Sequence, residues 1–326
     1  MNTEDEIVAV EGPNALADEN AEVAEDRPIR QNMIWLASYP KSGNTWVRVF
    51  IHNVLREIHG ETEGAQDINA LHRFAIWEHS LPHYSKVLGK PGNLASPAEL
   101  AAARPKVQRL ISSELPKMGI AKTHLMFGRD HGFPTIDLSV TRAAVYIVRN
   151  PLDVAVSYAH HSNRPVDHVI ADMARPGFRT PPEERHISEL TGAWGQHVAS
   201  WMGLGSRPVH VMRYEDMLAT PERTFGTLCR FLNIRIDREG LQRAIEKSSF
   251  SEVSRQEDDK GFVERPSGAD KFFRAGKAGG WRHDLTPKQI QTVIRTQAPM
   301  MQRLGYLSPN SGAPPVGSAI IASQIN

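Results

Sequence analysis

The sequence predicts an α/β fold, a single domain in which a central parallel sheet is flanked by helices. Two observations predict it. Three short, nearly continuous apolar runs are each typical of a strand buried on both faces. Each run is followed by a few polar residues and then by apolar residues at helical spacing. Strand, loop and helix repeated in this order indicate a parallel sheet, whose ligands bind beyond the carboxyl ends of the strands.

The elements can be assigned in order along the chain. The expected strands are Met33–Ser38 (MIWLAS), Ala143–Val148 (AAVYIV) and Pro208–Arg213 (PVHVMR). The expected helices after them are Thr45–His59, Asn150–His161 and Pro221–Leu232. Residues 60–118 and 162–190 are rich in Pro, Gly, His and charge and show no strong strand pattern. We therefore expect these two segments to be insertions over the ligand face.

The ends of the chain differ in composition from its middle. Residues 1–30 hold nine acidic side chains against two arginines and no aromatic residue, which predicts a disordered acidic tail. Residues 308–326 are expected to be a flexible C-terminal tail, and residues 31–307 to be the folded domain. The whole chain has a net charge of +1, so its middle is slightly basic. This excess suits an anionic ligand and is too small to indicate a nucleic-acid partner.

Composition also excludes several classes of protein. With 40% hydrophobic residues the chain is typical of a globular protein, and no apolar run is long enough to span a membrane. No secretory signal pattern is present, and a single cysteine, Cys229, indicates a reducing, cytoplasmic location. The histidines form no His-Glu-x-x-His motif and no cluster with cysteine, so no metal site is expected.

The segment after the first expected strand reads SYPKSGNTW, from Ser38 to Trp46. In a Walker loop the lysine follows the glycines, whereas here Lys41 precedes Gly43. The first amides of the following helix lack partners, and with the helix dipole they favour an anion. Lys41 adds a charge, and Ser42 and Thr45 add hydroxyl groups. The sequence thus predicts a P-loop-like strand–loop–helix nucleotide site.

This segment closely resembles the 5′-phosphosulfate loop of the cytosolic-type sulfotransferases, commonly S-Y-P-K-[SA]-G-T-T-W. These enzymes use 3′-phosphoadenosine 5′-phosphosulfate, PAPS, as sulfuryl donor. The resemblance implies that the nucleotide is bound by Lys41, Ser42, Gly43, Asn44, Thr45 and Trp46. Asn44 stands where the family usually has threonine. Trp46 either stacks on the base or packs in the core.

A second match is AKTHLMFG, Ala121–Gly128, which resembles the K-T-H-L-P segment of the same family. The resemblance implies that His124 is the general base and that Lys122 lies near the transferred sulfuryl group. Histidine suits the first role because its ordinary pKa lets it take a proton near neutral pH. Met126 stands where the family often has proline.

A third match, YIVRNPLDVAVSYAHH from Tyr146 to His161, resembles the 3′-phosphate site Y-I-x-R-N-P-x-D-x-x-x-S. Asn150 is placed to cap the following helix, and Asp153 to form a capping box with it. Helix capping accounts for Asn150 and Asp153 but gives no role to Arg149 and Ser157. The resemblance implies that these two residues bind the 3′-phosphate, and that Ser157 also restrains the loop lysine until the acceptor arrives.

Three later matches follow in the family's order. They are VMRYEDM (211–217), EKSSFSEV (246–253) and FFRAGKAGGWRHDLT (272–286). The nucleotide contacts that they imply are Tyr214, Ser248, Phe250, Arg274, Ala275 and Gly276. Ala275 stands where the family has lysine, and Lys271 or Lys277 could supply the lost charge. The family's dimer segment would fall on Arg282–Gln291 and is interrupted there, so monomer and homodimer both stay open.

Together the matches run from residue 35 to about residue 286. They indicate a PAPS-dependent sulfotransferase, most like bacterial members of the cytosolic-type family, that transfers a sulfuryl group by in-line displacement and needs no metal. The acceptor would be a hydroxyl, or an amine, of a small molecule, lipid or glycan. Two alternatives stay open: a catalytically inactive protein that binds PAPS or its product PAP, and a divergent P-loop kinase. The kinase is disfavoured because no Walker-B strand ending in aspartate is present.

Overall fold

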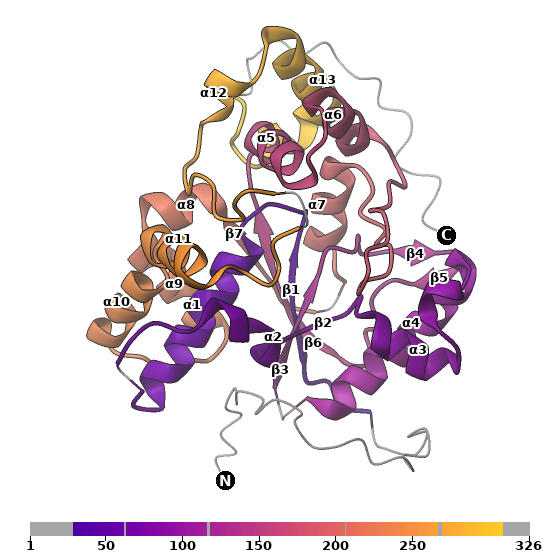
Figure 1. Cartoon of the computed structure of the whole chain (residues 1–326), viewed down its shortest axis with the longest axis horizontal. Helices are drawn as coiled ribbons and strands as arrows, with labels where there is room; N and C mark the ends of the chain where they lie inside the picture. Colours follow the sequence, from indigo (N-terminus) through magenta and orange to yellow (C-terminus); the bar gives the residue numbers. More distant parts are fainter. Residues whose placement is uncertain (1–28, 62, 116–117, 206, 267–268, 309–326) are drawn as a thin grey trace.

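A computed structural model describes residues 29–308, apart from residues 62, 116–117, 206 and 267–268 (Figure 1). The two tails expected from the sequence lie almost entirely outside the described residues. Within them the chain forms one central sheet with helices on both of its faces (Figure 1).

The central sheet has five strands in the order β2-β3-β1-β6-β7, and every neighbouring pair is parallel. Its strands are β1 (Met33–Ser38), β2 (Ala75–Trp77), β3 (Gly119–Thr123), β6 (Thr141–Val148) and β7 (Val209–Arg213). A separate two-stranded hairpin is made by β4 (Arg129–Asp130) and β5 (Phe133–Pro134). The predicted α/β class with a parallel sheet is confirmed, and three of the five strands lie where the sequence predicts them.

Alternate side chains of β1 enter the two separate cores of the domain. Trp35 belongs to the core that also holds residues of helices α3 (Leu81–Leu88), α4 (Pro97–Glu114), α5 (Pro151–Ser162), α6 (Val166–Ala174), α7 (Trp194–Met202) and α13 (Pro287–Arg303). Leu36 packs with α1 (Asn44–Ile58), α2 (Leu71–Phe74), α8 (Tyr214–Ala219), α9 (Pro221–Phe231) and α10 (Arg238–Lys247). Two cores on opposite faces explain why the central strands read as continuous apolar runs.

Short elements complete the fold beside these layers. They are the 3-10 helices η1 (Ile68–Ala70) and η2 (Gly92–Leu94), and the helices α11 (Phe250–Lys260) and α12 (Trp281–Asp284). A third, smaller core forms where α11 and the segment around Phe273 meet α1.

The sequence-based expectation for residues 60–118 is wrong in one respect. This segment holds the 18-residue helix α4, which packs Val107 and Ile111 against the sheet. Its apolar pattern is hard to read because two polar residues on its buried side, Arg104 and Gln108, are themselves fully buried. The neighbouring strand β2 has only three residues, which is too short for a period to show.

Candidate functional site

The loop between β1 and α1 turns through two residues with positive φ. Lys41 has φ 66° and Gly43, the N-cap of α1, has φ 105°. No side chain caps the helix, so its first amides are open to an outside acceptor. The Ser42 hydroxyl is buried and makes no hydrogen bond with the described residues. A buried hydroxyl without a partner next to free helix amides is the arrangement expected of an anion site.

Gly43 is required by the packing of this loop as well as by its backbone angle. A Cβ atom at this position would lie 2.8 Å from Cδ2 of Tyr214 and 3.2 Å from Cε of Met217. The Tyr214 ring in turn packs edge-on against Trp46 at a centroid distance of 5.6 Å. Trp46 also packs against Phe225 at 5.7 Å, so this tryptophan belongs in part to the core.

The unusual Asn44 has a local structural role. Its Nδ2 donates to the carbonyl of Leu36 at 2.9 Å, which ties the start of α1 back to β1. Its Oδ1 is buried without a partner among the described residues. The neighbouring Thr45 hydroxyl accepts a hydrogen bond from Arg48 at 3.0 Å.

The Lys41 ammonium is enclosed by residues of two other segments. Its Nζ lies 3.2 Å from Nδ1 of His161 on α5 and 4.1 Å from the centre of the Phe272 ring. Burial, reinforced by the positive charge of Arg149, lowers the pKa of Lys41 to about 7. Burial likewise lowers the pKa of His161 to about 3, so His161 is neutral and its Nδ1 accepts a hydrogen bond from the Lys41 ammonium.

The sequence assigned the restraint of Lys41 to Ser157, but the structure shows the contact with His161. These residues are four apart on α5 and therefore lie on the same face of this helix. Ser157 is half-buried and has no hydrogen bond within the described residues. Nothing in the spacing of His161 pointed to the lysine.

Arg149, at the end of β6, joins the loop to a more distant segment. Its Nη1 donates to the carbonyl of Lys41 at 3.1 Å, and its Nη2 to the carbonyl of Lys277 at 3.0 Å. The guanidinium lies over the Tyr214 ring at 4.2 Å, and Nε is buried without a partner in the described part of the chain. The predicted phosphate-binding arginine is therefore beside the loop and has a free donor.

His124 follows β3, the neighbour of β1, and its ring lies against the end of β1. Its Nδ1 is 2.7 Å from the carbonyl of Ser38 and 3.3 Å from the hydroxyl of the same residue. Burial and the charge of Lys122 hold the pKa of His124 well below its usual range. The ring is therefore neutral, and because a carbonyl only accepts, the proton lies on Nδ1 and the lone pair on Nε2.

Lys122, two residues earlier, lies among charged and aromatic side chains. Its Nζ is 3.9 Å from the centre of the Trp77 ring. Burial lowers the pKa of Lys122, while the carboxylate of Glu264 opposes that shift. Glu264 itself forms a two-pronged ion pair with the buried Arg48, at 2.6 and 2.5 Å.

Residues 271–281 form a strap that crosses the site. Three side chains hold its backbone. Glu257 accepts from the amides of Phe272 and Phe273, Arg149 donates to Lys277, and Asp153 accepts from the amides of Gly279 and Trp281. The Asn150 cap is confirmed, whereas the predicted capping box is wrong, because the Asp153 carboxylate binds the strap instead.

The strap places Gly276 against Phe250 but leaves Arg274 and Ala275 exposed. Gly276 has φ 57°, and a Cβ there would lie 2.2 Å from Cγ of Phe250, so the Phe250 ring lies directly on this glycine. Arg274 and Ala275 are exposed, and Arg274 lies 3.7 Å from Asp284. Lys271, one suggested substitute for the missing lysine, is engaged with Asp258 at 2.7 Å.

Ser248 differs from the other predicted contacts because its hydroxyl is already satisfied. It is fully buried, donates to the carbonyl of Ala244 at 2.6 Å and accepts from Nδ2 of Asn53 at 3.2 Å. These bonds direct the hydroxyl into the contact between α10 and α1.

Several residues at the site were missed by sequence reasoning. They are Arg48, Glu189, His197, Glu257 and Glu264. Each contributes through a contact with a segment remote in the sequence, so no local spacing identified them. The one available signal was a polar or charged residue next to apolar neighbours, as in SELTGAW around Glu189.

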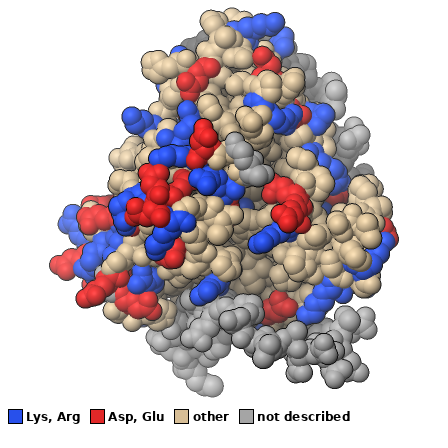
Figure 2. Space-filling view, in the orientation of Figure 1, with Lys and Arg blue, Asp and Glu red and all other residues tan. Residues whose placement is uncertain are grey.

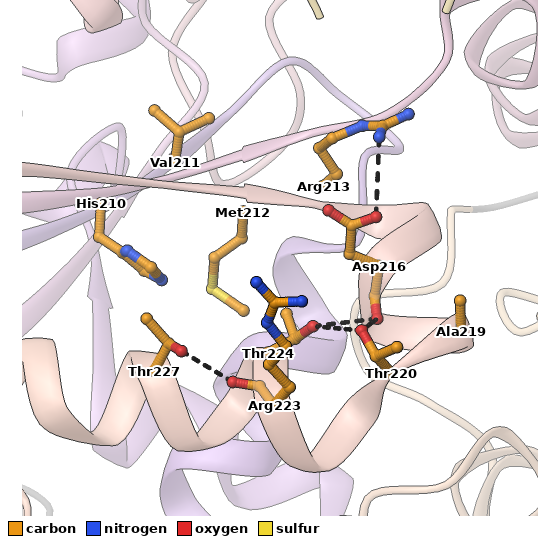
Figure 3. Close-up of a pocket in the computed structure, with 10 residues that line it drawn as sticks. All are labelled: His210, Val211, Met212, Arg213, Asp216, Ala219, Thr220, Arg223, Thr224 and Thr227. Carbon is orange, nitrogen blue, oxygen red and sulfur yellow. Dashed lines mark hydrogen bonds and ion pairs between the residues drawn. The ribbon is translucent and has the colours of Figure 1, made fainter. Parts of the chain in front are cut away.

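A pocket of about 480 Å³ lies apart from this site, along the edge strand β7 (Figure 3). Figure 3 shows that α8 and α9 form its floor, where the Thr220 and Thr224 hydroxyls bind the carbonyl of Asp216. Arg213 lies 3.7 Å from Asp216 above them. The lining contains none of the residues that the sequence assigned to the nucleotide or the reaction.

The described residues also bear on metals, membranes and nucleic acids. No group of three or more His, Cys, Asp or Glu among them is placed to hold a metal ion, and none of their helices is long and apolar enough to cross a membrane. Figure 2 shows one face of the molecule, on which basic and acidic side chains are interleaved, as over the lobe formed by α9, α10 and α11. This face presents no continuous basic surface of the kind that follows a nucleic-acid backbone.

Comparisons with known proteins extend over nearly the whole described chain. A family model described as "Sulfotransferase domain" matches residues 31–305. Sulfotransferase 1A1 of the dog, Canis lupus familiaris, is 25% identical over 293 residues, which cover 88% of this chain and 89% of the relative. Sulfotransferase 1A1 of cattle, Bos taurus, is 28% identical over 262 residues, 78% of each chain.

Solved structures show the same architecture at lower identity. Retinol dehydratase in complex with androsterone and the inactive cofactor PAP superposes with a TM-score of 0.58 at 20% identity, over 84% of this chain and 82% of that one. Mouse sulfotransferase SULT7A1 complexed with PAP gives a TM-score of 0.55 at 22% identity, over 85% and 88%. At such low sequence identity, these superpositions show that the fold is shared.

Proposed function

This chain belongs to the sulfotransferase family, whose members take a sulfuryl group from PAPS, and we propose that His124 is the general base of that transfer here. The acceptor would be a hydroxyl or an amine of a small molecule, lipid or glycan. The observation that carries the proposal is the bond from Nδ1 of His124 to the carbonyl of Ser38, because it leaves the basic Nε2 free.

The residues around the β1–α1 loop fit an anionic nucleotide. The Ser42 hydroxyl and Nε of Arg149 are both buried and unpaired among the described residues, and the first amides of α1 are uncapped. Such groups would hold two anionic groups, one at the helix start and one at the end of β6. Bound there, PAPS would supply the activated sulfuryl group.

Lys41 and Lys122 would stabilise negative charge during the transfer. Lys41 lies at the helix start and would neutralise the charge that develops on the leaving group, which requires it to be protonated. Lys122 lies two residues before the base and would hold the sulfuryl oxygens. The hydrogen bond from Lys41 to the neutral His161 would keep the Lys41 ammonium in position beside the loop.

The first test replaces the base. His124→Ala should lower kcat by about 10²- to 10⁴-fold, the usual contribution of a general base. The affinity for PAP, measured by calorimetry, should stay within about twofold because neither Nδ1 nor Nε2 is proposed to touch the nucleotide. The assay is transfer of label from PAPS to a panel of phenols, alcohols and amines.

The matched control is His59→Ala, an exposed histidine just beyond the far end of α1. It should transfer label at the parental rate. Full activity of His124→Ala would refute the base assignment. Binding of PAP with no turnover of any acceptor in the parental protein would favour the inactive binding protein, and consumption of ATP with Mg²⁺ would favour the kinase.

Acceptor class, oligomeric state and location stay predictions. The interrupted dimer segment falls on α12 and the start of α13, where Pro287 is the first helical residue. The cytoplasmic location rests on the cysteine count and the lack of a secretory signal pattern, and Cys229 is buried and free.

A further inference from the structure

The turn that carries His124 is held by one local hydrogen bond and by bonds to distant segments. The amide of Leu125 donates to the Thr123 hydroxyl at 3.0 Å, and that of Met126 to the carbonyl of Leu190 at 2.7 Å. The amide of His124 itself donates to Oε1 of Glu189 at 2.8 Å. Three successive amides are therefore fixed, and Glu189 is the one charged group that fixes them.

The carbonyls of the same turn are fixed from α7. Nε2 of His197 donates to the carbonyl of His124 at 3.0 Å, and Nε1 of Trp201 to the carbonyl of Leu125 at 2.8 Å. Burial lowers the pKa of His197 to about 4, so this histidine is neutral and contributes no charge.

Glu189 is itself held rigidly and is 4% exposed. Its amide donates to the Thr180 hydroxyl at 3.0 Å, and its carbonyl accepts from the amide of Thr180 at 2.9 Å. A buried carboxylate is costly unless it has partners, and here Oε1 lies 3.6 Å from Nδ1 of His79 as well as beside the His124 amide. A carboxylate kept at such a cost next to the reacting groups calls for a function.

We propose that Glu189 is a positioning residue for the reaction, whose carboxylate holds the backbone of His124 in place. The inference rests on the role proposed above for His124. It assigns to Glu189 no contact with either substrate.

Glu189 and Lys122 also influence each other's pKa. Burial raises the pKa of Glu189 to about 7, while the positive charge of Lys122 and the His124 amide oppose that rise. In the other direction, the carboxylates of Glu264 and Glu189 raise the pKa of Lys122 against its burial. The charged and titratable groups around this pair are Arg48, Glu78, His79, Arg104, His124, Glu183 and Glu264.

Two substitutions separate the parts of the proposed role. Glu189→Gln keeps an oxygen that can accept from the His124 amide and removes the charge, whereas Glu189→Ala removes both. Glu184→Gln, an exposed carboxylate on the same segment without a bond to the site, is the matched control. Losing a hydrogen bond to a charged group costs about 1.5–3 kcal/mol, or roughly 10- to 100-fold in rate.

We expect kcat to fall about 10-fold in Glu189→Gln and about 100-fold in Glu189→Ala, with the KM for PAPS little changed. The titration of Lys122, followed by NMR of ¹³C-labelled lysine in the PAP complex and assigned with Lys122→Arg, should move to lower pH in Glu189→Gln. The amide resonance of His124 should shift in Glu189→Ala. Glu184→Gln should match the parent in every readout.

The NMR readouts do not need turnover, so this inference and the base assignment can fail separately. Activity retained in His124→Ala would overturn the base, whatever Glu189 does. Parental kcat in both Glu189 variants, or an unshifted His124 amide resonance in folded Glu189→Ala, would overturn the role of Glu189. A loss of PAP affinity proportional to a loss of thermal stability in both variants would mark a purely structural residue and would overturn it too.

Discussion

The loops after β1 and β3 lie at the carboxyl ends of neighbouring strands, yet they are fixed by different kinds of contact. The first loop is shaped largely by its own residues, through positive φ at Lys41 and Gly43 and the bond from Asn44 back to β1. The turn after β3 is shaped by residues remote in the chain, since Glu189 is 65 residues from His124.

This difference separates two functions. Groups of the first loop face an anion through backbone amides, so changes there should act first on donor binding. The turn after β3 presents one imidazole, so changes there should act on turnover. Three predictions test that division, from the largest expected effect to the smallest.

Gly43→Ala should disrupt the donor loop most strongly. Its Cβ would contact the Tyr214 ring at 2.8 Å, and alanine is strained at φ 105°. Left-handed backbone and overpacking each cost about 1–3 kcal/mol, so we expect the free energy of unfolding to fall by about 2–4 kcal/mol. Binding of PAP should be lost, as measured by calorimetry on the folded protein.

The matched control for this change is Gly132→Ala in the β4–β5 turn. Gly132 also has positive φ, at 82°, but no atom lies within 4 Å of the added Cβ. Only the backbone strain of about 1 kcal/mol should then appear, with PAP binding intact. Equal losses in the two variants would show that contact with Tyr214 is unimportant.

Arg149→Ala should weaken PAPS much more than adenosine 5′-phosphosulfate, which lacks the 3′-phosphate. A lost charge-assisted bond of about 1.5–3 kcal/mol corresponds to roughly 10- to 100-fold in affinity. Some loss for both nucleotides is expected, because Arg149 also binds the carbonyls of Lys41 and Lys277. Equal losses for both would contradict the 3′-phosphate role and show that Arg149 only shapes the loop.

The pH dependence should distinguish the two loops without mutation. With the pKa of Lys41 near 7, the protonated fraction falls as pH rises through 7, and kcat/KM for PAPS should fall with it. The pKa of His124 is well below its usual range, so the acid limb should lie below pH 6.5. The bound donor anion stabilises the Lys41 ammonium. The alkaline fall of kcat should therefore occur at a higher pH than the alkaline fall of kcat/KM.

Lys41→Arg checks the assignment of the alkaline limb. An arginine stays charged throughout the range, so its residual activity should no longer fall near pH 7. A limb that persists there in Lys41→Arg would belong to another group.

Much of this protein could be predicted from the sequence because its signals are local. The run MIWLAS matches β1 residue for residue, and the motif around Arg149 places the start of α5 within one residue. Family membership followed from several such segments in order, and the family model confirms it. Strand β2 and helix α4 escaped detection because one is too short and the other buries polar residues.

The sequence by itself determined the fold class, the family and the residue types at the donor loop, since each depends on neighbours within a few positions. Only the tertiary structure decided what surrounds the reacting groups. Lys41 meets His161 from 120 residues away, Asp153 binds the strap instead of its own helix, and Glu189 lies behind His124. Burial and charge at these contacts set the pKa values, and burial exists only once the chain has folded.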